Sequence, residues 1–495
     1  MNLRKLALQI SIINATGTIL GFIVNILLGR EFGVSWELDC LFISLLIFSF
    51  FGIFNTFITS LLIPIFNEIK ARDEKEGFEF ADVIFKWSLL IGIIGWLIVL
   101  IGSPLIIKLF ASGFDEKAIS LTSEILKLLF IGYIFYNLTS SVSVILNALY
   151  LFLTPTLVAL LSPILNIFAI FILIPKYGVK SIAISYLFSN AIQVFILIPY
   201  LFIKTQWRPT LKVYHEKLPN LINQSSKAVL SSFILSLRDI ISRNIASHLG
   251  IGAITLLSYA DKIISILSQI VISPISSIFY SRVSELIAIS RWADIKDILL
   301  RTIRINISIS IFISAGVIVF LKSFLNLLFL NSRFTENDIY ILSYLMIIGL
   351  IYIVALSMEA ILVRMTYAVK RVNIVLFTAA VSVVLFYMLS KILSSFLNIY
   401  GLVLSVSITE IPVFIIYFYF ISKYADILPV NIFYPLIKNL VLAISFIIVG
   451  VFINSHLKKD IFILFLWCPI WVSLYLAVSR YTLKEEWGIL INKKV

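Results

Sequence analysis

The stretch WSLLIGIIGWLIVLIGSPLI, residues 87–106, contains no charged residue, and it is as long as one crossing of a bilayer core, which takes about 20 apolar residues. Residues 461–478, IFILFLWCPIWVSLYLAV, have the same character. Helices of soluble proteins usually keep a polar face over such a length. Comparable stretches recur from Leu8 to Val478 with short polar breaks, so the sequence predicts an all-α polytopic membrane protein.

The composition agrees with this fold class. Hydrophobic residues make up 61% of the chain and charged residues only 13%, so no soluble domain is predicted. The basic start MNLRKLALQ precedes an apolar stretch of full span length without a small-residue cleavage site, and we interpret it as a retained first span. Cys40 and Cys468 both lie in apolar stretches, which predicts neither a disulfide framework nor a thiolate metal site.

The apolar stretches divide into fourteen predicted spans. An even number of spans places both termini on the same side, and the side richer in Lys and Arg is normally cytoplasmic. With a cytoplasmic N-terminus, most of the 39 Lys and Arg fall in inside segments. Both termini are therefore predicted to be cytoplasmic, and the net charge of +13 reflects topology rather than nucleic-acid binding.

Three longer polar breaks are predicted on the cytoplasmic side, at residues 67–82, 204–227 and 282–304. All three are too short to hold a catalytic domain. The second contains Trp207 among several cations, which suits a segment lying on the anionic inner leaflet. A solvated loop that happens to carry a Trp fits the sequence equally well.

The chain contains a weak internal repeat. When Gly33 is aligned with Gly250, Glu68 meets Glu285 at the same shift, and Tyr177 resembles Tyr400 at a slightly larger one. Each copy would hold six spans, so the two copies share an orientation and are related by an axis along the membrane normal. This predicts two pseudo-symmetric six-helix lobes, residues 1–215 and 216–425, followed by two further helices and a cytoplasmic tail in residues 426–495. Paired lobes of this kind enclose the central cavity of alternating-access carriers, so transport is the leading function.

Charged side chains inside spans are candidates for function because burying them in lipid is unfavourable. The seventh predicted span carries Arg238, Asp239 and Arg243, and the spacing of Asp239 and Arg243 predicts that they pair on one helical face. The eighth carries Asp261 and Lys262, which point about 100° apart around a helix and cannot simply neutralise one another.

The cations of these two spans suit an anionic cargo. Arginine binds phosphate through a planar fork, so Arg238, Arg243 and Lys262, with Asp261 beside them, are predicted to bind a phosphate or diphosphate. The alternative is a structural role, in which these side chains form salt bridges between the lobes or extend toward the outer interface.

Three other acidic residues are predicted to act elsewhere in the cycle. Glu359 and Glu410 stand alone among apolar residues, and a buried carboxylate can bind a proton or help to ligate Na⁺. Together with Asp239 they are the predicted coupling residues, although each could instead pair with a cation across its lobe. Asp39 begins the second span, where it fits either a helix-start carboxylate or part of an outer gate.

Sequence motifs of soluble enzymes are missing from the chain. It has no phosphate-binding GxxxxGK[ST] loop, no HExxH and no paired CxxC, and it holds three histidines. ATP hydrolysis and metal catalysis therefore have no support, and no cofactor is predicted beyond Na⁺ or proton coupling.

The chain resembles the MurJ/MviN family of lipid-linked oligosaccharide flippases, within a superfamily that also holds multidrug extrusion carriers and polysaccharide exporters. The resemblance covers most of the chain in collinear order. It rests on Leu20–Phe22, Phe32–Gly33 with Asp39, Gly113–Phe114, Asn147, Pro155, Ser162–Ile167, Ala246–Ser247, Tyr259–Lys262 and Phe334–Thr335 with Asp338. It implies fourteen helices in two lobes, a bacterial inner-membrane location, and a lipid-linked glycan as cargo.

One departure from the family pattern concerns the cavity of the first lobe. Members that flip the peptidoglycan precursor lipid II typically carry arginines on the first two spans, whereas this chain has Thr18, Val24 and Asn25 on the first and Phe50, Phe51 and Asn55 on the second. Asn25 and Asn55 are the polar side chains left there to contact the substrate. Lys262 alone keeps a family cation, so lipid II itself is in doubt and a related polyprenyl-diphosphate glycan is equally compatible.

Three functions can be separated by their requirements. A flippase for a lipid-linked oligosaccharide needs the cations, and it would contact membrane lipids and the cell-envelope glycan synthesis enzymes as a monomer. A cation-coupled exporter of small amphipathic molecules would depend more on Asp239, Glu359 and Glu410. A membrane-embedded glycosyltransferase would need catalytic carboxylates on large outer loops, and the predicted outer loops are short.

Overall fold

The computed structural model describes residues 3–59, 62–205, 207–289, 291–329, 332–425, 430–457 and 459–483. These residues are almost entirely helical, and no strand occurs among them. The all-α fold class predicted from the apolar stretches is therefore confirmed. The chain divides into two compact units, Met1–Thr255 and Leu256–Val495.

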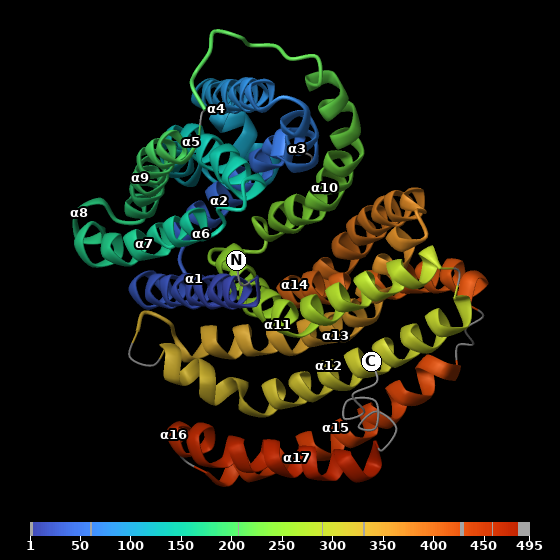
Figure 1. Ribbon diagram of the computed structural model, residues 1–495. Helices are drawn as coiled ribbons and strands as arrows, with labels where there is room; N and C mark the ends of the chain where they lie inside the picture. Colours follow the sequence, from blue (N-terminus) through green and yellow to red (C-terminus); the bar gives the residue numbers. More distant parts are fainter. Residues whose placement is uncertain are drawn as a thin grey trace. The chain divides into compact units, whose positions relative to one another are not determined.

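The first unit is built around helix α5, against which α2, α3, α4 and α9 pack, while α1 lies against α6 and α7 (Figure 1). Glycines allow the closest of these contacts: Gly92 of α4 lies against the backbone of Ile134 in α5, and Gly132 of α5 against that of Leu187 in α9. The helices of this unit are α1 (Leu3–Phe32), α2 (Trp36–Thr59), α3 (Leu62–Arg72), α4 (Glu74–Phe110), α5 (Glu116–Ala148), α6 (Leu153–Ala159), α7 (Leu161–Ile172), α8 (Ile174–Tyr177), α9 (Lys180–Lys204) and α10 (Leu218–Ala246).

In the second unit, α13 packs between α12 and α14 (Figure 1). The last helices join its core through an aromatic cluster in which Trp471 and Tyr475 of α17 contact Phe312 of α12 and Phe446 of α15. The helices are α11 (Ala253–Ala288), which starts at the end of the first unit, α12 (Trp292–Phe329), α13 (Glu336–Ala368), α14 (Val372–Ala425), α15 (Val430–His456), α16 (Asp460–Phe462), the π-helix η1 (Ile463–Trp467) and α17 (Cys468–Thr482).

The number of spans is the part of the predicted architecture that stays open. Among the described residues, 11 helices are long and apolar enough to cross a membrane, or 12 when the bent pair within α11 counts as one span. Helix α14 is counted once, yet its 54 residues are interrupted at Asn398, and at 1.5 Å per residue they extend about 80 Å, far beyond a core of about 30 Å. Dividing α14 and adding the more polar α10 would give the fourteen predicted spans.

The predicted domain boundaries also stay predictions. In this structure α10 groups with the helices before it, because it packs against α2 and contacts α4. The compact units therefore meet after Thr255 rather than after residue 215.

Two of the three predicted cytoplasmic breaks are largely helical. Helices α3 and α4 leave only Asp73 between them, and α11 and α12 are separated by residues 289–291. Charged pairs three or four residues apart support these exposed turns, as in Arg72 with Glu68 and Arg301 with Asp297. A polar break between two predicted spans can therefore be helical, because low hydropathy marks exit from the membrane rather than the end of a helix.

The linker between α9 and α10 is held against the N-terminal part of α4. Trp207 is only 2% exposed and packs against Phe85 and Phe202, so neither the membrane-surface interpretation nor the solvated-loop interpretation describes its side chain. Asp82, 1% exposed, accepts hydrogen bonds from the amide (2.9 Å) and hydroxyl (2.6 Å) of Thr210 and pairs with Lys86 at 2.7 Å. The ion pair of Asp82 and Lys86 thus binds the linker to α4.

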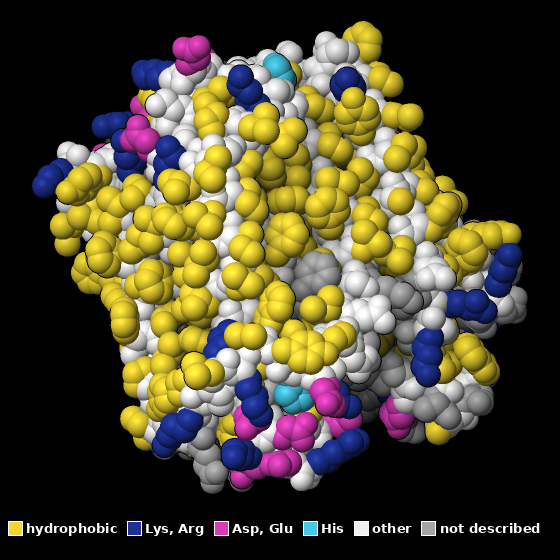
Figure 2. Space-filling model, turned by 90° about the horizontal axis from the view of Figure 1, so that it is seen from above, with side chains coloured by type: hydrophobic (Ala, Val, Ile, Leu, Met, Phe, Trp, Pro, Cys, Tyr) yellow, Lys and Arg dark blue, Asp and Glu magenta, His cyan; other side chains and the backbone are white. Residues whose placement is uncertain are grey.

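Figure 2 shows how charge is distributed over one face of the molecule. Hydrophobic side chains cover much of that face, and Lys, Arg, Asp and Glu gather in separate groups around its margins. Exposed hydrophobic side chains are what membrane-spanning helices present to lipid. With the apolar helices, this surface shows a multi-pass membrane protein.

Candidate functional site

The best-defined polar site of the first unit lies where three loops meet, at Asp39. Its Oδ2 accepts a hydrogen bond from the amide of Gly252 at 2.6 Å, and its Oδ1 accepts from both the amide and the hydroxyl of Thr255, each at 2.7 Å. Thr255 lies in the first turn of α11 and Gly252 directly precedes that helix, so a carboxylate on α2 caps a different helix. Gly252 has a positive φ of 81°, and a Cβ there would collide with the side chain of Val34.

A second set of hydrogen bonds joins the loop after α4 to the end of α10. The amide of Gly113 donates to Ser247 Oγ at 3.0 Å, and Asn244 Nδ2 donates to the carbonyl of Leu109 at 3.1 Å. Ser112 Oγ lies 2.8 Å from His248 Nε2. We call these bonds, together with those of Asp39, the outer clasp, because the predicted topology places all three loops on the outer side.

The outer clasp borders a cavity of about 450 Å³. Lys117 lies over the ring of Trp36, 4.4 Å from its centroid, at the wall of this cavity. The cavity is lined by Trp36, Asp39, Gly113, Phe114, Asp115, Lys117, Ala118, Ser247, His248, Gly250 and Ile251. The predicted gate residue Asp39 is therefore at a junction of loops, as a gate requires.

Helix α10 carries the predicted anion-binding arginines. Arg238 and Arg243 are both partly exposed and Asp239 is exposed, and all three take part in interactions. Arg243 lies close enough to Asp39 to interact with it electrostatically, and its Nη1 is 3.4 Å from Ser242 Oγ. The pairing of Asp239 with Arg243 stays a prediction.

Asp261 and Lys262 lie on α11 in the second unit, and both side chains are exposed. Exposure suits a side chain that meets water or cargo. That Lys262 faces a central cavity also stays a prediction.

The two predicted amide contacts differ in how available they are. Asn25 is half-buried, and its Nδ2 donates to the carbonyl of Gly21 in its own helix at 2.6 Å. Asn55 is buried, and within the described part of the chain its Oδ1 accepts no hydrogen bond. The Oδ1 of Asn55 can therefore still accept a hydrogen bond from a substrate, whereas the Nδ2 of Asn25 already donates one within its own helix.

Aromatic packing surrounds two of the second-span residues where the sequence lacks the charge expected from the family resemblance. Phe50 contacts Phe110 and Phe233 with ring centroids 5.5 Å apart, and Phe51 meets Phe130 at 5.0 Å. These rings are part of the packing between α2 and its neighbours. An arginine at either position would have to displace it.

The predicted coupling residues of the second unit lie on neighbouring helices. Glu359 on α13 and Glu410 on α14 both lie within electrostatic range of the Tyr417 hydroxyl, which accepts a hydrogen bond from Thr378 Oγ1 at 2.6 Å. Glu410 is almost fully buried. The two acids are isolated in the sequence, but α13 and α14 pack side by side, and the role of both acids in coupling stays a prediction.

Sequence reasoning missed several partners. Tyr417 and Thr378 are neutral, so a search for charges inside spans passes over them. Asp82 and Lys86 are four residues apart, a spacing that predicts an ion pair. Nothing local in the sequence predicts that Thr210 joins that pair, or that Gly252 and Thr255 reach Asp39.

Comparison with known proteins agrees with the fold. The family model of the lipid II flippase MurJ matches residues 14–473. A probable lipid II flippase MurJ of Buchnera aphidicola subsp. Schizaphis graminum is 27% identical over 437 residues, covering 86% of this chain and 84% of that protein. The corresponding protein of Aquifex aeolicus is 25% identical over 504 residues, covering 96% and 93%.

Solved structures show the same architecture. A lipid II flippase MurJ in an inward closed conformation aligns with a TM-score of 0.82 at 20% identity, covering 96% of this chain and 99% of that chain. An inward-facing multidrug transporter of the MATE family aligns with a TM-score of 0.71 at 18% identity, covering 83% and 94%. Since the family match covers nearly the whole chain, this chain belongs to the MurJ family of lipid II flippases.

Proposed function

We propose that this protein moves a polyprenyl-diphosphate-linked oligosaccharide, lipid II or a related cell-envelope precursor, from the cytoplasmic to the outer leaflet by alternating access. The observation that carries the proposal is the outer clasp. In an alternating-access carrier one side must be held closed while the other is open, and the clasp joins three loops at one end of the first unit through a buried carboxylate. The match to a flippase family supplies the class of cargo.

The cargo's diphosphate would be bound by the cations of α10 and α11. A diphosphate carries about two negative charges, and leaving them unpaired in a low-dielectric cavity costs several kcal/mol. Arg238, Arg243 and Lys262 are the intramembrane cations available, with Asp261, Asn25 and Asn55 as polar neighbours. The neutral amides and packed aromatic rings of the first unit favour a cargo whose charge is recognised mainly by these three residues.

Ion coupling is the second part of the proposal. Glu410 and Tyr417 are buried in the second unit and Glu359 is partly buried there, and carboxylate oxygens of this kind suit Na⁺ or a proton. Asp239 is the corresponding candidate on α10. The same group also supports the alternative of a cation-coupled exporter of small amphipathic molecules. Neither function makes the protein an enzyme.

Transport in reconstituted vesicles tests the cargo. We expect the double variant Arg238→Ala with Lys262→Ala to abolish flipping of a lipid-diphosphate glycan, because at least two cations must meet the diphosphate. Lys127→Ala, an exposed cation on α5, is the matched control and should leave transport unchanged. Comparing lipid II with other polyprenyl-diphosphate glycans in this assay identifies the glycan.

Unchanged transport in the double variant would reject anion recognition by these residues. If a small amphipathic cation were then exported in response to a Na⁺ or proton gradient, the exporter function would replace the flippase.

A further inference from the structure

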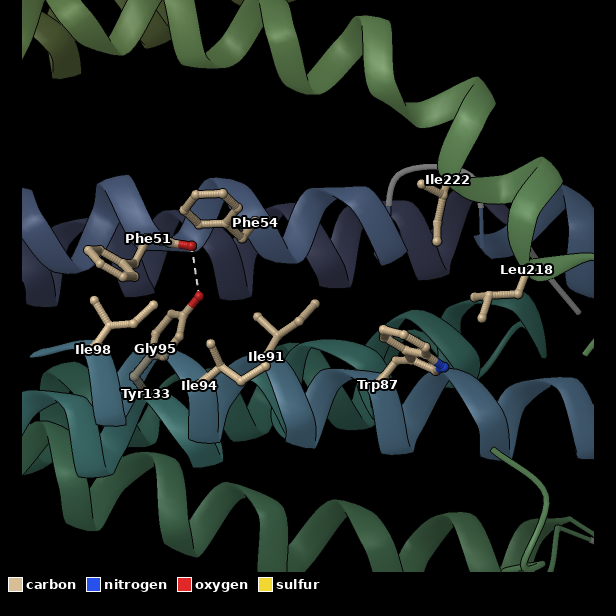
Figure 3. Close-up of a pocket in the computed structure, with 10 residues that line it drawn as sticks. All are labelled: Phe51, Phe54, Trp87, Ile91, Ile94, Gly95, Ile98, Tyr133, Leu218 and Ile222. Atoms are coloured by element: carbon tan, nitrogen blue, oxygen red, sulfur yellow. Dashed lines mark hydrogen bonds between the residues drawn. The ribbon is translucent and has the colours of Figure 1, made fainter. Parts of the chain in front are cut away.

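A narrow apolar groove lies in the first unit, apart from every residue assigned to cargo or coupling. Its volume is about 300 Å³, and its walls come from α2, α4, α5 and α10 (Figure 3). The lining residues are Phe51, Phe54, Trp87, Ile91, Ile94, Gly95, Ile98, Tyr133, Leu218 and Ile222. Cavities of this size are at the small end of those that hold ligands, so a bulky sugar headgroup is too large for it.

The groove offers no free side-chain donor to an occupant. Its lining includes two side chains with polar atoms, and both atoms are engaged. Tyr133 Oη donates to the carbonyl of Phe51 at 2.7 Å, which Figure 3 shows as a dashed line, and Trp87 Nε1 donates to the carbonyl of Val213 at 3.0 Å. A ligand here can therefore gain only from burying apolar surface, which selects hydrocarbon.

The length and position of the groove match one leaflet. Trp87 and Ile98 mark its ends along α4, and at 1.5 Å per residue they lie about 16 Å apart. Half of a bilayer's hydrocarbon core is about 15 Å thick. Trp87 follows Lys86, which pairs with Asp82 beneath the linker, so this end of the groove lies at the charged, predicted cytoplasmic edge.

The groove is continuous with the lipid-facing surface of α4. Ile94 is 45% exposed within it, and Ile98 is exposed to a similar degree. Farther along the same helix, Ile101 and Leu105 are exposed outside the groove, on a surface that must meet lipid in a multi-pass membrane protein. A hydrocarbon chain can therefore enter from the bilayer without crossing a polar barrier.

We propose that this groove holds one acyl chain of a phospholipid from the cytoplasmic leaflet. A linear acyl chain is thinner than a methyl-branched polyprenyl chain, so the small volume favours phospholipid over the tail of the cargo. The occupant separates α10, through Leu218 and Ile222, from Trp87 and Ile91 of α4. The bound lipid thus stabilises the position of the helix that carries Arg238 and Arg243. The assignment depends on the proposed orientation but not on the identity of the cargo.

Photocrosslinking of the full-length protein in lipid nanodiscs tests the assignment. The probe is phosphatidylcholine with a diazirine near the middle of one acyl chain, and labelled peptides are mapped by mass spectrometry. We expect labelling of residues 87–98 that falls about tenfold in Ile94→Trp, because the indole fills the groove without adding charge. Ile101→Trp is the matched control, an isoleucine on the same helix that is 82% exposed outside the groove, and it should keep the labelling.

A second variant guards against a folding defect in the first. Ile222→Trp fills the groove from α10 and should reduce labelling of α4 to the same extent, with the elution volume of the purified protein unchanged. Equal labelling in the filled and control variants would overturn the assignment, because it would mean ordinary lipid contact. Labelling by a diazirine polyprenyl phosphate but not by the phospholipid would also overturn it.

Discussion

The single carboxylate of Asp39 joins α2 to the start of α11, although nothing in the sequence of either helix predicts that the two meet. Replacing it with Ala leaves the amides of Gly252 and Thr255 without their acceptor, and losing hydrogen bonds to a charged group costs about 1.5–3 kcal/mol each at most. We expect Asp39→Ala to lower the midpoint of thermal unfolding and to open the outer clasp. Asp39→Asn keeps an acceptor oxygen and should have a smaller effect.

Cysteine accessibility checks this prediction. Ser247→Cys, in a chain with Cys40→Ser and Cys468→Ser, should react faster with a membrane-impermeant maleimide when Asp39→Ala is added. Glu37→Ala, in the same first turn of α2, is the control. Equal reaction rates in all three proteins would show that Asp39 does not keep the clasp closed.

Asp82 makes a second prediction because it is a buried charge with partners on two segments. Asp82→Asn removes the ion pair with Lys86 and weakens the bonds to Thr210, so we expect a loss of about 2 kcal/mol in the free energy of unfolding. Glu124→Gln, which breaks an exposed pair with Lys180, should cost under about 1 kcal/mol. Denaturant unfolding in detergent compares the two variants, and similar losses would contradict the role of burial.

The contact between α4 and α5 depends on glycine at one position. A Cβ at Gly92 would come within 2.8 Å of Ile134 Cα, which belongs to a backbone that cannot rotate away. We expect Gly92→Ala to destabilise the protein by about 1–3 kcal/mol through overpacking. Gly102→Ala, on the same helix, meets only the Ile106 side chain at 3.9 Å and should be neutral or slightly stabilising. The difference in their thermal midpoints measures the effect.

The apolar pattern predicted the existence of the helices well, but it predicted their ends poorly. Hydropathy falls wherever a helix leaves the bilayer, while the helix itself continues until its backbone bonds find other partners. At α4 that limit is Asp73, whose side chain accepts from the amides of Lys75 and Glu76. The linker was unpredictable for a different reason. Trp207 is buried only because Phe85 and Phe202, far apart in sequence, converge on it.

The orientation of the chain can be tested through α14. The non-helical backbone at Asn398 divides α14 into two predicted spans, so Asn398 should lie outside and Lys370 inside. We expect Asn398→Cys to react with an impermeant maleimide in intact cells, and Lys370→Cys only after the cells are opened. The same result for both cysteines would contradict the fourteen-span topology. In that topology one span separates the two positions, so they must lie on opposite sides of the membrane.

The class of the protein could be predicted from the sequence more fully than its site. The search for charged residues inside spans found Arg238, Glu410 and Asp39, because burying an ionised group in lipid is unfavourable unless the group has a function or a partner. Which groups meet could not be predicted, because those contacts join residues that lie far apart in the sequence, 213 positions in the case of Asp39 and Gly252. Glu359 and Glu410 share Tyr417 only through the packing of α13 against α14.

The outer clasp also affects the rate at which the protein changes conformation. Opening it means releasing three hydrogen bonds from one carboxylate together, and each 1.4 kcal/mol not recovered from water slows that step about tenfold. Conformational steps of this kind often limit the turnover of proteins that open and close around a ligand. We therefore expect the rate at which Asp39 detaches from α11 to set the pace of the cycle, so that a variant with a weaker clasp exchanges between states faster while occupying the closed one less.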